Sequence, residues 1–390
     1  MSAQPESASP VTVVVVDDSA TQRRFIRGAV AADPMLEVVG EARTGRDAIA
    51  LVERHRPTVV LMDLHLPVMN GIQAIERIMA LRPTPIVVYS SFVDGEDRAN
   101  AESAYAAGAV DVMAKPGTND SGRLEEYAEA LRQRLRVAGR VRVITHPRGR
   151  LGGSSSSLTT MRLGMVAQMP ATTGSTVTCE PSAELIASLE AREVKLLAIG
   201  ASTGGPQALA AVLAGLPERT TIPILVVQHM ADGFMEGLAE WLNDVCPLPV
   251  ALAVDGRRLV PGTVALAPSG QNLIVHDRYR VTMREPDPGQ YHVPGIDTTF
   301  TSVADAYRST SVGVLLTGMG RDGAAGLKRI RDEGGLTIGQ DESTSTVYGM
   351  PAAAMSADAV DIQLPLPEIC TAIHHLLATS PPVDPSGAAP

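Results

Sequence analysis

The chain has 390 residues, and its 45% of hydrophobic and 19% of charged residues exclude wholesale disorder and allow two folded domains. A formal net charge of −10 and only 3% of aromatic residues argue against a protein that coats nucleic acid, and the N-terminus lacks the basic and apolar regions of a signal peptide. Because no apolar run reaches the ~18 residues of a membrane helix and the three cysteines form no CxxC pair, we expect a cytoplasmic protein that is not membrane-inserted and has no disulfide framework or thiolate zinc site.

Residues 8–137 alternate between strand-like and helix-like patterns. The first run, Val11–Val16, is continuous and mostly β-branched, as expected for a strand buried on both faces of a parallel sheet. Further strands are predicted at Leu36–Val39, Thr58–Met62, Pro85–Tyr89 and Ala109–Met113, and helices at Ala20–Ala31, Gly45–His55, Gly71–Leu81, Glu96–Ala107 and Leu124–Val137. This alternation predicts a doubly wound α/β domain of five strands.

Three carboxylates, a hydroxyl and an ammonium group are predicted to meet at one edge of this sheet. Asp17 and Asp18 follow the first strand, Asp63 follows the third, Ser90 ends the fourth and Lys115 ends the fifth. Since the carboxyl ends of parallel strands share one edge, we expect the three aspartates to hold Mg²⁺ there. The serine and the lysine would complete a pocket for a phosphoryl group, with Asp63 as its covalent acceptor. A single aspartate after a strand is more often a helix N-cap, so the combination carries the prediction.

This combination resembles the response-regulator receiver domain. The resemblance rests on Asp17-Asp18-Ser19, on Met62–Gly71 (MDLHLPVMNG), on Ser90 and on Lys115-Pro116. The chain departs from the family at Asn70, where aspartate is usual, a position peripheral to the phosphoryl pocket. The resemblance implies that a histidine kinase phosphorylates Asp63 in the presence of Mg²⁺.

The regular pattern is lost over residues 138–192, whose Gly-, Ser- and Thr-rich stretches predict a flexible linker. The run of arginines from Arg132 to Arg150 is either a solvated helix end or a docking patch for an acidic partner. Residues 193–380 predict a second doubly wound α/β domain with a largely parallel sheet, and residues 381–390 predict a disordered tail. Its strands are predicted at Lys195–Ile199, Thr221–Val227, Val250–Val254, Thr263–Ala267, Leu273–His276, Val312–Leu316 and Leu336–Ile338, and its helices at Gln207–Leu213, Phe234–Asp244, Thr298–Tyr307 and Ala324–Glu333.

Ser202 stands between a predicted strand and a predicted helix, in the sequence Gly200-x-Ser202-x-Gly204. The glycines let backbones approach closely, and Pro206 suits the first turn of a helix. One interpretation is a turn that binds an anion at the helix N-terminus, although the motifs GxGxxG and GK[ST] are absent. The other interpretation is a strand-to-helix elbow that presents Ser202 as a nucleophile.

A base and a carboxylate follow two other strands of this domain. His229 follows the strand Thr221–Val227, and Asp322 lies in a glycine-rich turn after the strand Val312–Leu316. Both are therefore predicted at the same sheet edge as Ser202, as a serine nucleophile requires. Asp322 alone would be interpreted as an N-cap. Three further histidines are less well placed, one in an exposed turn and two in a C-terminal helical pattern: His276, His374 and His375.

The second domain resembles the protein-glutamate methylesterase of bacterial chemotaxis, CheB. The resemblance rests on Ile199–Gly205 (IGASTGG), Gln228–Met230 (QHM), Leu316–Gly326 (LTGMGRDGAAG) and Gln340–Pro351 (QDESTSTVYGMP). It implies that Ser202 attacks γ-glutamyl methyl esters on the cytoplasmic helices of chemoreceptors, that His229 carries the proton and that Asp322 orients the imidazole. Thr203 and Met319 are the candidates for oxyanion stabilisation.

The resemblance further implies deamidation of selected receptor glutamines by the same chemistry and no cofactor for the hydrolysis itself. It also implies that the unphosphorylated receiver occludes the catalytic cleft until Asp63 is phosphorylated. The chain departs from the CheB pattern at Asn272, Gly295 and Glu236, where His, Ser and positive charge are usual. The alternative is a response regulator whose second domain is a binding module in another signalling array. A transcriptional regulator is disfavoured because no basic recognition helix is evident.

Overall fold

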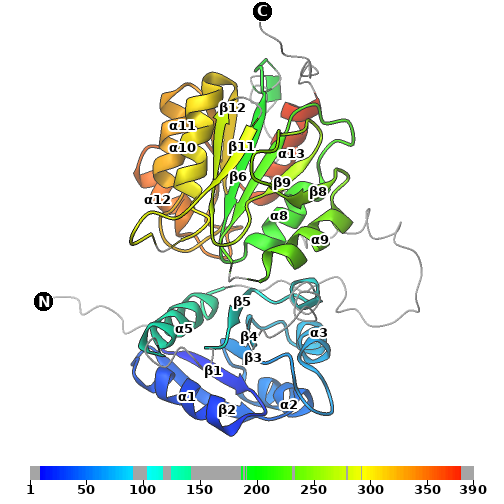
Figure 1. The fold of residues 1–390 in the computed structure, drawn as a ribbon. Coiled ribbons are helices and arrows are strands. Elements are labelled where there is room, and N and C mark those ends of the chain that lie inside the picture. The colour runs from blue at the N-terminus through cyan, green and yellow to red at the C-terminus, as the bar shows by residue number, and fades with distance from the viewer. Residues whose placement is uncertain are drawn as a thin grey trace, which may run out of the picture. The chain divides into compact units, whose positions relative to one another are not determined.

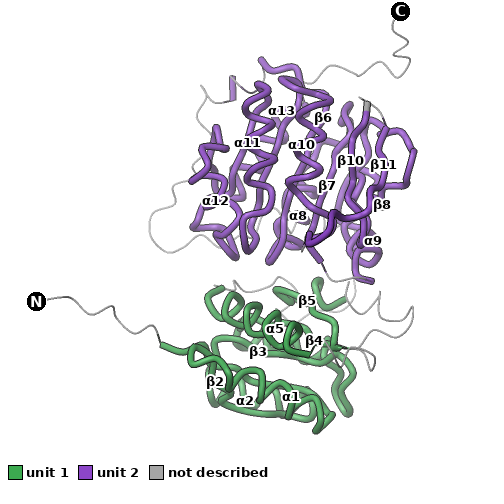
Figure 2. The backbone as a smooth tube through the Cα atoms, turned by 60° about the vertical axis from the view of Figure 1, so that its left-hand side comes forward, with its two compact units in different colours: residues 1–154 green, residues 155–390 purple. Residues whose placement is uncertain are grey.

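The computed structural model describes residues 9–90, 103–116, 124–141, 186–187, 189, 191–230, 233–277, 280–290 and 292–378. The chain divides into two compact units, residues 1–154 and residues 155–390, which Figure 2 colours separately. The predicted tail, most of the predicted linker and the first residues of the predicted helix Glu96–Ala107 lie outside the described residues. No helix in the described part of the chain is long and apolar enough to cross a membrane.

The N-terminal unit is built on a five-stranded parallel sheet of order β2-β1-β3-β4-β5. Its strands are β1 (Val11–Val16), β2 (Leu36–Ala42), β3 (Val59–Met62), β4 (Ile86–Ser90) and β5 (Asp111–Ala114). Every residue of β3 and β4 is buried, as their apolar runs require of central parallel strands. The predicted doubly wound fold of five strands is confirmed.

Helices cover both faces of this sheet (Figure 1). They are α1 (Ala20–Ala31), α2 (Gly45–His55), α3 (Gly71–Leu81) and α5 (Leu124–Ala138). Helices α1 and α5 share one apolar core with the strands, while α2 and α3 pack together. The first three helices keep their predicted bounds because Ser19, Thr44 and Asn70 cap their N-termini through side-chain oxygens. Asn70 therefore serves as the N-cap of α3.

The C-terminal unit is built on a seven-stranded parallel sheet of order β14-β13-β12-β6-β7-β9-β8. Its strands are β6 (Leu196–Ala201), β7 (Ile224–Gln228), β8 (Val250–Leu252), β9 (Val264–Leu266), β12 (Ser311–Leu315), β13 (Leu336–Gln340) and β14 (Ile362–Leu364). The three central strands β12, β6 and β7 are buried along their whole length. The expectation of a second, largely parallel α/β sheet is confirmed.

Helices and a hairpin surround this sheet (Figure 1). The helices are α8 (Gly205–Ala214), α9 (Met235–Val245), α10 (Ile296–Tyr307), α11 (Ala324–Asp332), α12 (Met350–Ser356) and α13 (Leu366–Ala378). Strands β10 (Asn272–Asp277) and β11 (Arg280–Arg284) form a separate antiparallel hairpin that packs on α10. Sequence patterns missed β11, β14 and α12, because the two strands contain polar residues and lack the continuous apolar run of a central strand, and the helix of seven residues is too short to display a period.

Each sheet has a point at which the chain passes from one side of the sheet's first strand to the other. In the N-terminal unit the chain leaves β1 for β2 on one side and returns to β3 on the other. In the C-terminal unit it leaves β6 for β7 on one side and later reaches β12 on the other. Doubly wound sheets bind ligands outside the carboxyl ends of the strands at such points. The fold therefore offers one site per unit, at β1/β3 and at β6/β12.

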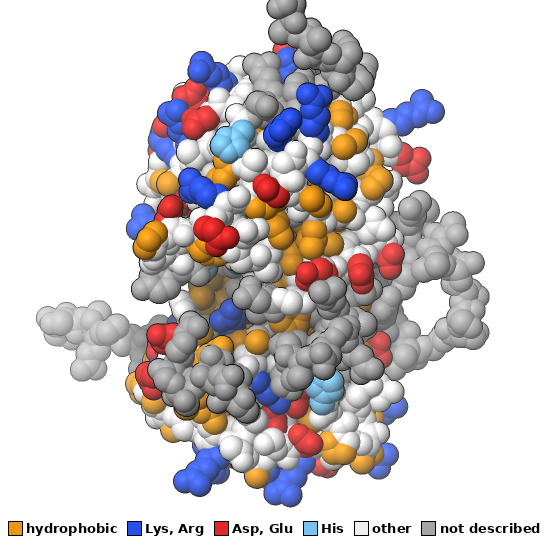
Figure 3. Space-filling model, in the orientation of Figure 1, with side chains coloured by type: hydrophobic (Ala, Val, Ile, Leu, Met, Phe, Trp, Pro, Cys, Tyr) orange, Lys and Arg blue, Asp and Glu red, His pale blue; other side chains and the backbone are white. Residues whose placement is uncertain are grey.

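Both signs of charge occur on the face of the molecule shown in Figure 3. Blue Lys and Arg side chains alternate with red Asp and Glu side chains around hydrophobic ones on the described part of this face. Nucleic-acid binding needs basic side chains gathered on one surface. Among the described residues shown there, basic side chains are interspersed with acidic ones and do not gather on one surface, and the net charge of the chain is −10.

Candidate active site

The residues expected to form the phosphoryl pocket meet at the β1/β3 edge. Lys115 Nζ lies 2.7 Å from Asp63 Oδ2 and 2.7 Å from Asp17 Oδ2. Ser90 Oγ donates a hydrogen bond of 3.1 Å to Asp63 Oδ1. Asp63 is buried, and its two oxygens are engaged by one ammonium, one hydroxyl and the backbone N–H of His65 (3.4 Å). This arrangement aligns a carboxylate with the groups that would contact an attached phosphoryl group.

The acidic side chains beside Asp63 fit a divalent cation. Ligand oxygens of Asp17, Asp18 and Asp63 all lie within 4.8 Å of one another. Asp17 Oδ2 is buried and lies 2.7 Å from the ammonium of Lys115, which it shares with Asp63. Burial raises the pKa of Asp17 despite that ammonium, and a bound cation would offset the cost of its charge. Three carboxylates form the hard-oxygen donor set that Mg²⁺ prefers.

The turn that carries Asp17 and Asp18 is held by a residue that sequence analysis missed. Arg23 on α1 is buried, and its Nη1 donates to the carbonyl oxygens of Asp17 (2.7 Å) and Asp18 (3.0 Å). Its Nε lies 3.3 Å from Glu41 Oε2 on β2. The guanidinium thus ties the first carboxylate turn to the neighbouring strand.

Ser202 lies directly after β6, at the β6/β12 edge. Its backbone N–H donates to the carbonyl oxygen of Thr317 (3.0 Å), which follows β12. Gly204 then adopts φ +75° as the N-cap of α8, a conformation that favours glycine. The close approach of Gly318 adds a second constraint, since a Cβ at Gly318 would lie 2.7 Å from the Cβ of Ser202. The serine is therefore held in a strand-to-helix turn, as the elbow interpretation expects.

The backbones of Ser202 and His229 are joined by Gln228, the last residue of β7. Its Nε2 donates to the carbonyl oxygen of Ser202 (2.8 Å) and to that of His229 (2.8 Å). The N–H of His229 donates to the carbonyl oxygen of Ala201 (3.0 Å). Gln228 is buried, and it fixes the ends of β6 and β7 relative to each other.

His229 and Asp322 form a direct pair. His229 Nε2 lies 2.8 Å from Asp322 Oδ2, and the backbone N–H groups of Ile296 and Asp297 donate to Asp322 at 2.8 and 2.9 Å. Burial alone would raise the pKa of Asp322, but these hydrogen bonds outweigh it and lower the pKa to about 2. An ionised carboxylate only accepts hydrogen bonds, so Nε2 carries the ring proton of the neutral imidazole.

The other ring nitrogen of His229 is the chemically available one. Nδ1 is buried and has no hydrogen-bond partner in the described part of the chain. It is unprotonated in the tautomer that Asp322 selects, so it is an acceptor without a donor. Such an atom beside the end of β6 can take the proton of a serine hydroxyl.

Two family models match the chain. One is the response regulator receiver domain over residues 13–127, and the other is CheB methylesterase over residues 197–373. The chain is 40% identical to protein-glutamate methylesterase/protein-glutamine glutaminase 4 of Geobacter metallireducens, over 94% of this chain and 99% of that one. The chain belongs to the protein-glutamate methylesterase/protein-glutamine glutaminase family.

Further members of the methylesterase/glutaminase family align over nearly the same length. Protein 3 of Paramagnetospirillum magneticum is 38% identical over 97% of this chain and 98% of its own. Protein 2 of Anaeromyxobacter dehalogenans is 40% identical over 94% of this chain and 97% of its own. The receiver and the methylesterase domain thus occur together in similar proteins, which makes both sites parts of one architecture.

The two oxyanion candidates and the less well placed histidines differ in their surroundings. The backbone N–H groups of Thr203 and Met319 donate no hydrogen bond to any described residue, which suits donors that await an oxyanion. His276 is exposed on β10. His374 is exposed on α13, with Nδ1 3.0 Å from the carbonyl oxygen of Gly215.

Two departures from the CheB pattern lie together beside Asp322. The buried side chain of Asn272 accepts a hydrogen bond from the N–H of Gly295 (2.8 Å). Asn272 and Gln290 also exchange two amide hydrogen bonds of 2.8 and 3.0 Å. The departures thus belong to one hydrogen-bonded group that precedes the two donors to Asp322.

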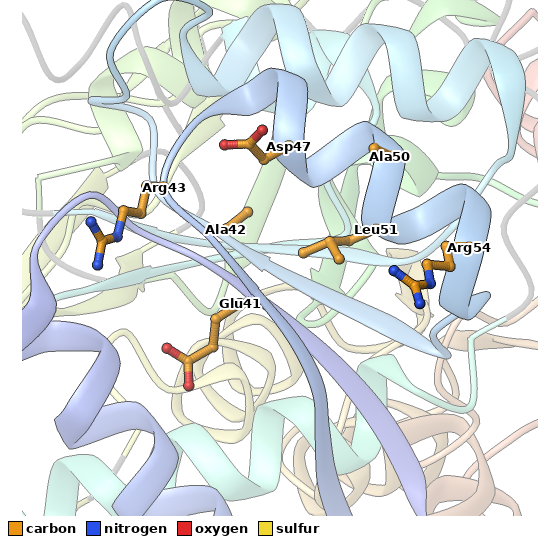
Figure 4. A pocket seen from close by; sticks show the side chains of 7 residues that line it. All are labelled: Glu41, Ala42, Arg43, Asp47, Ala50, Leu51 and Arg54. Atoms are coloured by element: carbon orange, nitrogen blue, oxygen red, sulfur yellow. The ribbon is translucent and has the colours of Figure 1, made fainter.

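A surface hollow of about 390 Å³ lies on the N-terminal unit, at the end of β2 and along α2 (Figure 4). It is lined by Glu41, Ala42, Arg43, Asp47, Ala50, Leu51 and Arg54, from the end of β2 and from α2. None of the candidate phosphoryl-pocket or catalytic residues lines it, and its charged lining has both signs.

Proposed function

We propose that the chain is a phosphorylation-activated protein-glutamate methylesterase that uses Ser202, His229 and Asp322 and also deamidates selected glutamines. The observation that carries the proposal is the His229–Asp322 pair, 2.8 Å between Nε2 and Oδ2, with a buried Nδ1 left without a partner. The family membership of the chain and the position of Ser202 at the adjacent strand end support it.

In the first half of the reaction, Ser202 is acylated. Its Oγ forms a bond to the carbonyl carbon of a γ-glutamyl methyl ester while its proton moves to His229 Nδ1. The carbonyl π electrons move to oxygen, and the resulting oxyanion would accept hydrogen bonds from the N–H groups of Thr203 and Met319. When the carbonyl re-forms, the C–O bond to methoxide breaks, and the proton on Nδ1 leaves with it as methanol.

The second half repeats these steps with water. His229 Nδ1 accepts a proton from the water that attacks the acyl carbon, and it returns that proton to Ser202 Oγ as glutamate leaves. Asp322 holds Nε2–H throughout and stabilises the imidazolium that forms twice per cycle. A glutamine side chain would follow the same route, with ammonia as the first leaving group and glutamate as the same product.

Asp63 is the proposed phosphorylation site, with a histidine kinase of a chemotaxis array as donor. A Mg²⁺ ion held by Asp17, Asp18 and Asp63 would neutralise negative charge during phosphoryl transfer. Lys115 and Ser90 already contact Asp63 and would contact the phosphoryl oxygens. The substrate would be a methylated chemoreceptor helix, which makes the cytoplasm the proposed place of action.

The test is methanol release from membranes that contain methylated chemoreceptors. The native chain would be compared with the chain plus acetyl phosphate and Mg²⁺, with Ser202→Ala and with Asp63→Asn. We expect Ser202→Ala to abolish release, a loss of at least about 10³-fold. Phosphorylation should raise release in the native chain and leave Asp63→Asn unchanged.

Two other outcomes would revise the proposal. Release that needs Ser202 but ignores acetyl phosphate would separate the esterase from the receiver. A folded, phosphorylated chain that released no methanol or ammonia from any receptor type would favour the binding-module alternative.

A further inference from the structure

The imidazole of His229 is covered on one face by a second imidazole. The ring centroids of His229 and His292 are 4.5 Å apart and the ring planes differ by 8°, so the two rings are stacked. His292 itself is exposed, whereas the side chain of His229 retains only 8% of its exposure. His292 therefore lies between the ring of the proposed base and solvent on that face.

The pair with Asp322 restrains His229 at one edge only. The ring is attached to the backbone through Cγ, and the hydrogen bond at Nε2 fixes a second point, but the ring can still rock about the line that joins these two points. Rocking displaces Nδ1, because Nδ1 lies off that line. A flat partner against the ring face opposes this rocking, because dispersion contact is lost as soon as the planes diverge.

The backbone of His292 is itself fixed. Gln290 Nε2 donates to the carbonyl oxygen of His292 (2.8 Å), and Gln290 is paired through its amide with the buried Asn272. Asn272 Oδ1 also accepts from the N–H of Gly295, and the two residues after Gly295 donate to Asp322. One short segment thus holds both the face of His229 and the carboxylate at its edge.

We propose that His292 is a positioning residue for the esterase reaction, which it serves by keeping the ring of His229 in the plane that presents Nδ1 to Ser202. This inference rests on the proposed function for its substrate, although the stacked geometry does not depend on it. The flat ring is the active feature of His292, and the Asn272–Gln290 amide pair keeps that ring in place. His292 touches no reacting atom and acts through His229.

Two variants test which property of the His292 side chain matters: its flat ring, its bulk or its charge. His292→Phe keeps a flat ring, and His292→Leu keeps apolar bulk without one. We expect His292→Leu to lower kcat for methanol release about 10- to 100-fold with KM within about twofold, because small misplacements of a catalytic group cost rate rather than binding. His292→Phe should stay within about threefold of the native kcat, since stacking is retained. The melting temperatures of both variants should match that of the native chain.

A second readout needs no substrate. Imidazole ¹⁵N resonances of His229, assigned with His229→Gln, should show one protonated and one unprotonated nitrogen at pH 8 in the native chain and in His292→Phe. In His292→Leu we expect these resonances to broaden or average as the ring moves. If no receptor yields methanol but the resonances behave in this way, the esterase proposal fails and the positioning role stands. Equal kcat and equal spectra in all three proteins, or a Phe variant as impaired as the Leu variant, would overturn the positioning role.

Discussion

At the scale of single residues, Asp322 and its neighbour Asp297 have pKa values shifted in opposite directions. Hydrogen bonds from His229 and from two backbone N–H groups overcome the effect of burial and lower the pKa of Asp322. Burial raises the pKa of the neighbouring Asp297, and the charge of Asp322 adds to that rise. The site therefore concentrates its negative charge on Asp322, the carboxylate that pairs with His229.

Replacing Asp322 by asparagine should lower both activity and stability. The amide can donate to Nε2 and so favours the wrong tautomer, for which we expect a loss of kcat of about 10²- to 10⁴-fold. A lowered folded-state pKa means that ionised Asp322 stabilises the fold above its unfolded pKa and loses this effect as the pH falls towards about 2. The destabilisation by Asp322→Asn, measured by urea unfolding, should therefore be about 2 kcal/mol at pH 7 and shrink steadily below pH 4.

Asp297→Asn is the matched control for this stability effect. Its pKa is raised in the folded state, so ionised Asp297 opposes folding at neutral pH. The variant should be as stable as the native chain at pH 7, or more stable. Destabilisation of both variants by the same amount at pH 7 would contradict the assignment of charge to Asp322.

Gly318→Ala should impair Ser202 through contact alone. A Cβ at position 318 would lie 2.7 Å from Ser202 Cβ and 2.3 Å from Met350 Sδ, closer than packed atoms allow. We expect kcat to fall about 10- to 100-fold because the nucleophile must shift. Gly215→Ala is the control, since its added Cβ would have no neighbour nearer than 3.6 Å. Equal methanol release from the two variants would show that the close approach at Gly318 is unimportant.

At the scale of elements, the turns after strands carry the chemistry and neighbouring elements hold those turns. The turn after β1 is held by Arg23 of α1, which contacts two of its carbonyl oxygens and Glu41 of β2. The turns after β6 and β7 are held by Gln228 through two further carbonyl oxygens. The regular hydrogen bonds of the sheet stop where a strand ends. In both units, one buried side chain then donates to two of the carbonyl oxygens in the turn.

Arg23→Lys should weaken Mg²⁺ binding by the N-terminal unit. A lysine ammonium cannot span two carbonyl oxygens and Glu41, so the carboxylates of Asp17 and Asp18 would lose their support. We expect the Kd for Mg²⁺, measured by calorimetric titration, to rise about 10-fold, as for other residues that orient metal ligands. Arg27→Lys is the control, because Arg27 contacts Glu41 from an exposed position on the same helix. Unchanged affinity in Arg23→Lys would contradict this supporting role.

At the scale of the whole molecule, each unit has a core of its own. One buried cluster joins β1, β3 and β4 to α1 and α5, and another joins β6, β7 and β12 to α10 and α11. Neither cluster includes residues of the other unit. Each unit therefore meets the basic requirement for independent folding.

We expect calorimetric unfolding of the full chain to show two transitions. Mg²⁺ with beryllofluoride, a phosphoryl mimic for Asp63, should raise one transition by roughly 5 °C or more when both are far above their Kd, because ligands stabilise only the unit that binds them. The other transition should shift by less than this, and Asp63→Asn should abolish the shift. A single transition, or an equal shift of both, would contradict independent cores.

The strands and the residues at their ends could be predicted from the sequence because apolar runs end in polar residues. Central strands of parallel sheets are apolar throughout, so a polar residue such as Ser202 or Asp63 stands out where the strand stops. Gln228 also stands at a strand end, but the sequence does not show that its amide joins two carbonyl oxygens, and Arg23 lies within a helix and has no such signal. The stacking of His292 on His229 likewise joins segments separated by more than sixty residues. Such contacts become visible only when the strands are in place.

The order of β7, β6 and β12 in the C-terminal sheet sets the spacing between the three candidate catalytic residues. The strand before the serine lies in the middle, with the strand before the histidine on one side and the strand before the aspartate on the other. Adjacent strands are about 4.8 Å apart, so each partner starts one strand width from the serine, within reach of its own side chain. Unrelated parallel sheets in which the chain passes from one side of a middle strand to the other have the same spacing between neighbouring strand ends. Such sheets therefore allow Ser, His and Asp to be brought together independently. The order of Ser, His and Asp along the sequence then depends on how the strands are connected and not on the chemistry of the site.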